Sequence, residues 1–315
     1  MSASTVQEEK AAAPEAVSSA VRRNLSSPWA SFFVIVITIL WTIPTFGLFV
    51  TSLRPSDKAN QNGWWNAFVD HTFTADNYSQ VITGGDVIPQ GIEQFFINSL
   101  IITIPAVLIP LAIATMAAYA LAWIPFRGST FIFVTCFALQ VVPLQMALLP
   151  LLQLFNKGWK VNGVSIIPPI GGHGTYYQLW IAHTMFALPL AIFLIHNFMS
   201  QIPKDLMEAA VMDGAGHLRI FRTIVLPLSI PAIASFAIFQ FLWVWNDLLV
   251  ALTFAGGNDQ VAPMTVYLSN IKGTYGSALH LVTAGAFVSI LMPLVVFFAL
   301  QRYFVRGLLA GSVKG

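Results

Sequence analysis

The residues whose types and spacing could do chemistry lie in one polar segment, residues 203–227, between two long apolar stretches. Its fixed residues, at gaps that are hard to obtain by accident, are Glu208, Ala209, Ala210, Gly214, Ile224, Leu226 and Pro227. Pro203 can begin a short helix, because its missing N–H would be unpaired there in any case. Asp205 and Glu208 favour the positive end of that helix. Gly214 can end it in a left-handed conformation that other residues adopt only with strain.

The chemistry that this segment predicts is the docking of a second protein, not the breaking of a covalent bond. One helix face is expected to hold residues at i, i+3, i+4 and i+7, which are Leu206, Ala209, Ala210 and Asp213. Small side chains there let another protein approach the backbone. A second short helix, about 217–223, carries two arginines, and Leu226-Pro227 is expected to turn the chain into the next apolar stretch. A helix lying on lipid headgroups would explain the arginines, but it gains from large apolar residues and not from an alanine pair.

Covalent chemistry finds little support elsewhere in the chain. The six histidines show no paired metal spacing, and we find no Ser/His/Asp grouping. The single cysteine, Cys136, excludes a disulfide framework within the chain and a cysteine-based metal site. A phosphate-binding loop needs Gly-Lys before Ser or Thr, and the sequence contains no Gly-Lys pair. We therefore predict no catalytic site, and ATP hydrolysis by that route would need a separate polypeptide.

The composition predicts an all-α membrane protein. Hydrophobic residues make up 57% of the 315 residues and charged residues 9%, whereas a soluble domain carries roughly 25% charged residues. Lipid must therefore cover much of the surface. The net charge of +2, with scattered basic residues, gives no support for nucleic-acid binding.

Six stretches are long and apolar enough to cross a bilayer as helices, which takes about 20 residues. They are Ala30 to Leu53, Phe95 to Trp123, Phe131 to Phe155, Tyr176 to Met199, Leu228 to Leu252 and Val282 to Leu300. Residues 1–28 have no periodic apolar face, so we expect a disordered tail there, followed by a six-span domain over 29–315 with a loop at 200–227. The first apolar stretch is too long for a signal peptide and reaches no small-residue cleavage site.

The basic residues predict the orientation. With both termini in the cytoplasm, ten of the fifteen Lys and Arg residues fall on cytoplasmic segments, as the positive-inside rule requires. This orientation places the 200–227 loop in the cytoplasm. It also places two long segments, about 54–94 and 253–283, on the outer face.

Polar residues inside apolar spans are costly and are candidates for a transport path. We single out Gln240, Trp245, Asn246 and Asp247, at the end of the fifth stretch, as a candidate substrate path or outer gate. Amides and carboxylates hydrogen-bond sugars, and aromatic rings cover their apolar faces. The alternative is that a given glutamine or histidine only holds helices together.

The 203–227 segment, with all seven fixed residues in place, resembles the signature loop of permease subunits of binding-protein-dependent ATP-binding-cassette (ABC) importers. The resemblance covers nearly everything after residue 28. Residues 245–249, Trp-Asn-Asp-Leu-Leu, and the C-terminal residues 301–315 resemble carbohydrate permeases of the maltose-transporter group. Residues 118–128 match more loosely, since the family usually has more basic residues there than this chain supplies.

The resemblance implies a type I importer permease fold with six transmembrane helices and a cytoplasmic coupling helix. It implies that Glu208, Ala209, Ala210, Asp213 and Gly214 contact an ATPase subunit. The implied partners are a homologous second permease, two ATPases, an extracytoplasmic solute-binding protein and membrane lipid. ATP and Mg²⁺ would be held by the ATPases and no cofactor by this chain. Its location would be the bacterial cytoplasmic (inner) membrane, where it would move a sugar or oligosaccharide by alternating access.

Three alternatives stay open. A permease of the same family could carry another solute, such as a polyamine or an amino acid. An autonomous secondary transporter or channel would need ionisable relays within the membrane, and Asp247 is the only acid near a span. A membrane-embedded enzyme would need a metal or nucleophile constellation that the sequence does not offer.

Overall fold

Long apolar helices dominate the computed structural model, which describes residues 28–85, 88–171, 174–255, 258–274 and 278–312. Within them, five helical segments are long and apolar enough to cross a membrane, or six if one bent pair counts as a span. The five are α2 (Pro28–Ser52), α6 (Glu93–Trp123), α9 (Tyr176–Met199), the continuous segment His217–Trp245, and Leu279–Gln301 of α15 (Leu279–Ser312). The all-α membrane fold is therefore confirmed. The predicted tail lies almost wholly outside the described residues.

The third predicted span, 131–155, is not one continuous helix. It is a pair, α7 (Ser129–Ala138) with the 3-10 turn Leu139–Val141, then α8 (Leu144–Lys157), bent by 102°. The break is at Val142, whose φ of −68° and ψ of 119° are extended. Pro143 explains this, because the residue before a proline is disfavoured in the helical region.

The fifth predicted span is wrong at both ends. The short helix expected at 217–223 does not stand apart, because α11 (His217–Ile220) continues through a π-helical turn, Phe221–Val225, into α12 (Leu226–Trp245). The Leu226 N–H bonds to the Phe221 carbonyl, five residues back, so Pro227 enters the helix without turning the chain. At its other end α12 stops at Trp245, and α13 (Leu249–Ala255) is a separate helix.

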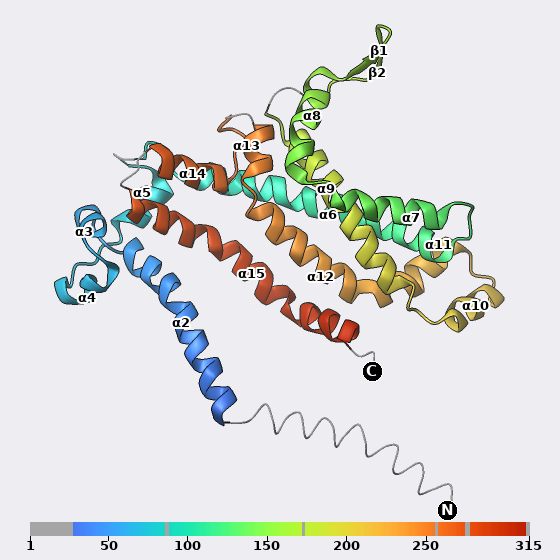
Figure 1. Cartoon of the computed structure of the whole chain (residues 1–315), viewed down its shortest axis with the longest axis horizontal. Helices are drawn as coiled ribbons and strands as arrows, with labels where there is room; N and C mark the ends of the chain where they lie inside the picture. The colour runs from blue at the N-terminus through green and yellow to red at the C-terminus, as the bar shows by residue number, and fades with distance from the viewer. Residues whose placement is uncertain (1–27, 86–87, 172–173, 256–257, 275–277, 313–315) are drawn as a thin grey trace, which may run out of the picture.

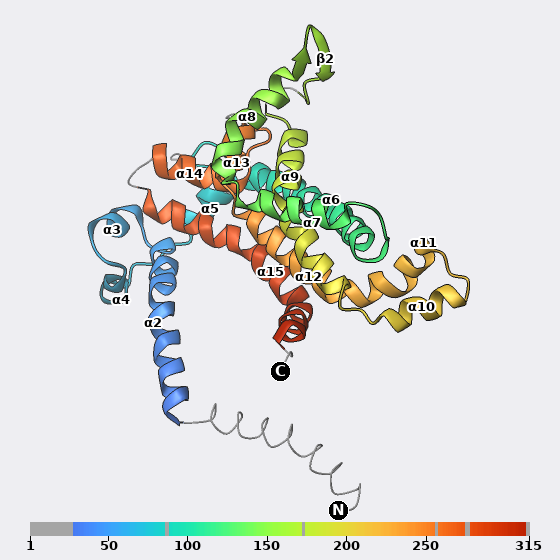
Figure 2. The same ribbon diagram turned by 45° about the vertical axis from the view of Figure 1, so that its right-hand side comes forward.

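The long helices pack as one bundle. α6 and α9 lie along each other, α12 packs against α6, α9 and α15, and α2 lies at the edge, mainly against α15 (Figure 1). The bundle has two distinct ends. The loop end carries α10 (Lys204–Met212) and α11, and the opposite end carries the short helices (Figures 1 and 2). Those short helices are α3 (Ser56–Gln61), a 3-10 turn (Trp64–Asn66), α4 (Ala67–Asp70), α5 (Asp76–Thr83), α13 and α14 (Met264–Thr274).

A small hairpin projects beyond the bundle after α8 (Figures 1 and 2). Its antiparallel strands are β1 (Trp159–Val161) and β2 (Val164–Ile167). Asn162 and Gly163 both have positive φ, 50° and 82°, which is the geometry of the tight turn that matches strand twist. The Asn-Gly pair is the sequence signal for this hairpin, which was not predicted.

Candidate functional site

The predicted docking helix is present as α10, and its ends are built as expected. Pro203 precedes it and Asp205 lies in its first turn. At its far end the Gly214 N–H bonds to the Val211 carbonyl (2.9 Å) and the Ala215 N–H to the Ala210 carbonyl (2.9 Å). This pair of bonds is a Schellman motif, which needs a left-handed residue. Gly214 supplies it, with φ of +77°.

The predicted face of α10 is divided between the protein's own core and its surface. Ala210, with Met207 three residues before it, is buried, and both pack in a core cluster with Ile195 and Ile220. Ala209 is exposed. The expectation that Ala210 shares an open face with its neighbours is therefore wrong. Helical spacing places Met207 and Ala210 on one face of α10. Spacing alone does not show that this face is the one that meets the bundle.

The outward surface of α10 and its connection to α11, which we call the docking surface, joins acidic and apolar side chains. Its exposed members are Lys204, Asp205, Leu206, Glu208, Ala209, Val211, Met212, Asp213, Gly214 and Leu218, so one basic side chain lies among the acids. Among its large apolar side chains Met212 is the most open, with 86% of its surface exposed. Large apolar side chains left open on a surface are typical of interaction sites.

The docking surface is held on the end of α6. The Tyr119 hydroxyl donates to the His217 carbonyl (3.2 Å) at the start of α11, and its ring lies 5.0 Å from that of Phe221. One turn further along α6, the Trp123 indole N–H donates to the Met199 carbonyl (3.2 Å) at the end of α9. Both flanks of the loop are thus fixed to one helix. Movement of the loop would therefore move the end of α6 with it.

The four candidate gate residues are not gathered round one cavity. Gln240 and Trp245 are buried between helices, where the Gln240 amide donates to the Ala106 carbonyl (3.2 Å) and the Trp245 indole to the Ser289 carbonyl (3.2 Å). Asn246 is exposed and its amide donates to the carbonyl of Leu242 in its own helix (2.8 Å). For Gln240 and Trp245 the contacts are those of residues that hold helices together. Substrate contact stays a prediction.

Asp247 caps the helix that follows it. Its carboxylate accepts the Ala251 N–H (3.0 Å) at the start of α13, and the Thr265 hydroxyl donates to its carbonyl (2.6 Å). The ionisable side chain that faces it is His183 of α9, with Nε2 4.0 Å from the carboxylate. Burial raises the pKa of Asp247, and the backbone N–H groups of α13 offset part of that rise.

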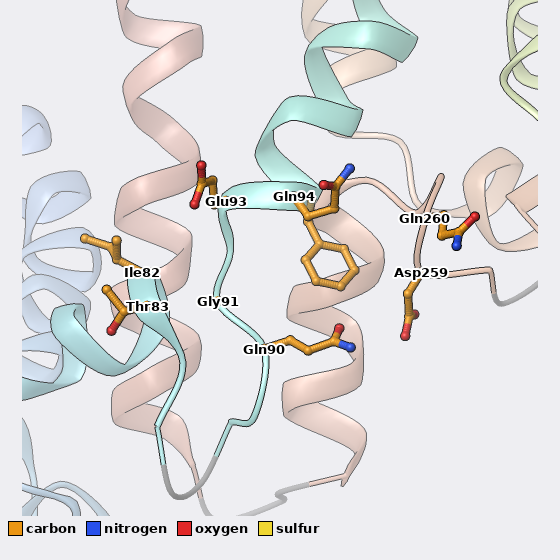
Figure 3. Close-up of a pocket in the computed structure, with 9 residues that line it drawn as sticks. Ile82, Thr83, Gln90, Gly91, Glu93, Gln94, Asp259 and Gln260 are labelled. Atoms are coloured by element: carbon orange, nitrogen blue, oxygen red, sulfur yellow. The ribbon is translucent and has the colours of Figure 1, made fainter.

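A cavity of about 810 Å³ opens at the opposite end of the bundle. It lies between the end of α5, the start of α6 and the segment before α14 (Figure 3). Its polar lining residues are Thr83, Gln90, Glu93, Gln94, Asp259 and Gln260. The two long segments that the sequence places on the outer face therefore meet here. Asn98 of α6, fully buried, donates to the Ala262 carbonyl (2.9 Å) and ties the start of α6 to the segment before α14.

Among the described residues no group of three His, Cys, Asp or Glu side chains could hold a metal ion. Apolar helices of spanning length, with the short helix α10 at one end, make this an all-α membrane protein. The chain belongs to the family described as binding-protein-dependent transport system inner membrane component, whose model matches residues 111–309. It is thus an inner-membrane component of such a system.

Similar proteins support this membership. The chain is 49% identical over 285 residues to the osmoprotective compounds uptake permease protein GgtD of Synechocystis sp., covering 89% of this chain and 90% of that one. It is 48% identical over 276 residues to the alpha-glucoside transport system permease protein AglG of Rhizobium meliloti (87% and 70%). It is 32% identical over 274 residues to the melibiose/raffinose/stachyose import permease protein MelC of Bacillus subtilis (87% and 91%).

A solved structure shares the fold. A chain of a bacterial ABC transporter involved in the import of the acidic polysaccharide alginate has a TM-score of 0.65 at 12% identity, covering 91% of this chain and 98% of that chain. At that identity the likeness concerns the fold alone.

Proposed function

We propose that this chain is one transmembrane subunit of an ATP-driven ABC importer for a sugar, oligosaccharide or glycoside. A homologous second permease completes the path, and two ATPases supply the energy. The observation that carries the proposal is the docking surface, an exposed acidic and apolar helix face fixed to the bundle at both flanks. A face fixed in this way can transmit the movement of a bound partner to the transmembrane helices.

The solute class rests on the relatives. AglG and MelC are named for alpha-glucosides and for melibiose, raffinose and stachyose, and GgtD for osmoprotective compounds. Several carbohydrates among these names favour a carbohydrate here. A polyamine or amino acid importer has no comparable support among them.

In this proposal the ATPases bind the docking surface, and the solute-binding protein binds the opposite end of the bundle. The positive-inside count supports this orientation, with both termini in the cytoplasm. A second structure of similar fold, with TM-score 0.62, is an alginate transporter in complex with a periplasmic protein bound to alginate pentasaccharide. The cavity between the two outer segments lies on the surface that such a protein would approach. ATP binding and hydrolysis then bias the outward-open and inward-open states.

The test is a charge reversal on the docking surface. In Glu208→Lys we expect at least a tenfold loss of co-purified ATPase, about 1.4 kcal/mol of binding free energy, with membrane insertion unchanged. Uptake of methyl α-glucoside, melibiose and raffinose should fall with it. The matched control is Asp57→Lys, an exposed acid at the opposite end, which should retain the co-purified ATPase. Normal uptake and normal ATPase recovery with Glu208→Lys would contradict the assignment.

A further inference from the structure

Six prolines lie inside the long helices, at Pro44, Pro105, Pro110, Pro189, Pro231 and Pro293, and for three of them the freed carbonyl has a side-chain donor from another helix. In an α-helix the N–H of residue i bonds to the carbonyl of residue i−4, and proline has no N–H. The three pairs of proline and freed carbonyl are Pro105 with Ile101 and Pro110 with Ala106 in α6, and Pro293 with Ser289 in α15. Lipid offers no water to satisfy such a carbonyl, so another protein group must do so.

Each of these carbonyls accepts a hydrogen bond from a side chain of a neighbouring helix. The bonds are Trp180 Nε1 of α9 to the Ile101 oxygen (2.9 Å), Gln240 Nε2 of α12 to the Ala106 oxygen (3.2 Å) and Trp245 Nε1 of α12 to the Ser289 oxygen (3.2 Å). Each of these three donors meets the carbonyl that lies four residues before a proline, and that carbonyl lacks its backbone donor.

Two of the three donors belong to the helix that leaves the docking loop. His217–Trp245 is one continuous helical segment, with Gln240 and Trp245 near its far end, both buried. A proline position is also where a helix bends most easily, because one bond of its ladder is missing. The donors thus hold α6 and α15 at their softest points.

We propose that Trp180, Gln240 and Trp245 are positioning residues for transport, which hold α9 and α12 to the proline positions of α6 and α15. Movement of α12 is then delivered through Gln240 to α6 and through Trp245 to α15. The source of that movement, ATPase docking at the loop, rests on the proposed function. The pairing of donors with prolines does not.

The test replaces a proline by alanine, which restores the backbone N–H that the proline lacks. Gln240→Met keeps the length of the side chain but removes the donor, so the Ala106 carbonyl is left alone. Pro110→Ala restores an N–H that can bond to Ala106 within α6. We expect Gln240→Met to lower the apparent Tm of the detergent-purified complex by about 2–4 °C, and Gln240→Met with Pro110→Ala to recover it.

The matched control crosses the pairs. Pro105→Ala restores a donor for Ile101, one turn away in the same helix, and should not rescue Gln240→Met. If Pro105→Ala rescues the Tm as well as Pro110→Ala does, or if neither does, the pairing is wrong. Trp245→Phe with Pro293→Ala repeats the test on α15.

Transport separates positioning from simple satisfaction of a carbonyl. We expect the initial rate of melibiose, raffinose or methyl α-glucoside uptake per inserted subunit to fall severalfold in Gln240→Met. It should stay low in the double variant, whose Tm has recovered but whose link between α12 and α6 has not. Full recovery of both Tm and uptake would overturn the positioning role. If the wild type carries none of these sugars, the proposed solute class fails by itself, while the Tm comparison still decides the pairing.

Discussion

Two glycines near the end of α10 differ in their backbone conformation. A Cβ added to Gly214 or to Gly216 would meet nothing within 4 Å, so neither position is needed for space. Gly214, however, has φ of +77°, while Gly216 has φ of −77°. Only the first is in the left-handed region, where an L side chain costs roughly 1–2 kcal/mol.

We therefore expect Gly214→Ala to destabilise the end of α10 by about 1 kcal/mol and Gly216→Ala to leave it nearly unchanged. Faster amide hydrogen exchange over 205–215 in the first variant, with a parallel loss of co-purified ATPase, would check this. Equal behaviour of the two variants would show that the Schellman motif does not set the shape of the docking surface.

The glycine was predictable and the burial of Ala210 was not. The left-handed conformation follows from a local need, a helix that must end before the next one begins, and a glycine at that point signals it. Which side of α10 meets the bundle depends on Met207 reaching Ile195 and Ile220, residues that are remote in the sequence. Helical periodicity gives the faces but not their surroundings.

At the scale of elements, Asp247 lies at the junction between the end of α12 and the start of α13. Its carboxylate caps α13 through the Ala251 N–H, and it is mostly buried, facing His183. Burial raises its pKa, so the folded state holds the proton more tightly than the unfolded chain does. Stability linked to this group is complete below the ordinary pKa and decreases as the pH rises through the raised one.

Asp247→Asn keeps a capping oxygen and removes the ionisation, so its Tm should be less dependent on pH on the acidic side of neutrality than that of the wild type. Asp247→Ala loses the cap and should be less stable than Asp247→Asn by about 1 kcal/mol. Melting curves of the purified complex between about pH 4 and 7 measure both effects. Asp57→Asn, at an exposed acid, is the control. An unchanged pH profile in Asp247→Asn would refute the burial argument.

The existence of the spans was predictable because twenty apolar residues admit few other structures. Their breaks were less so. Pro143 interrupts the third span, whereas Pro105 and Pro110 lie inside an unbroken α6. In α6, Trp180 and Gln240 donate to the carbonyls that the two prolines free. A single sequence shows prolines but not the donors that will face them.

At the scale of the whole molecule, the bundle leaves much apolar surface uncovered. In α2 only 11% of the most apolar stretch is buried, and the Trp41 side chain is 77% exposed. Lipid and a second permease are the two covers that the proposed function provides. The chain also has no Gly-Lys pair with which to build a phosphate-binding loop. On this view the isolated subunit has neither a complete path nor a source of energy.

Reconstitution tests this dependence directly. In proteoliposomes, the complex that co-purifies with this chain should accumulate labelled melibiose, raffinose or methyl α-glucoside only with ATP inside and the solute-binding protein outside. The subunit alone should accumulate none of them under a proton or sodium gradient. A solute that binds the outward-open and inward-open states equally well does not shift the equilibrium between them, so accumulation needs ATP. The matched control is the preparation purified with Glu208→Lys, which keeps the helix bundle but is expected to lose the ATPases. Uphill uptake by the lone subunit on an ion gradient would instead identify a secondary transporter, and the docking surface would then need another partner.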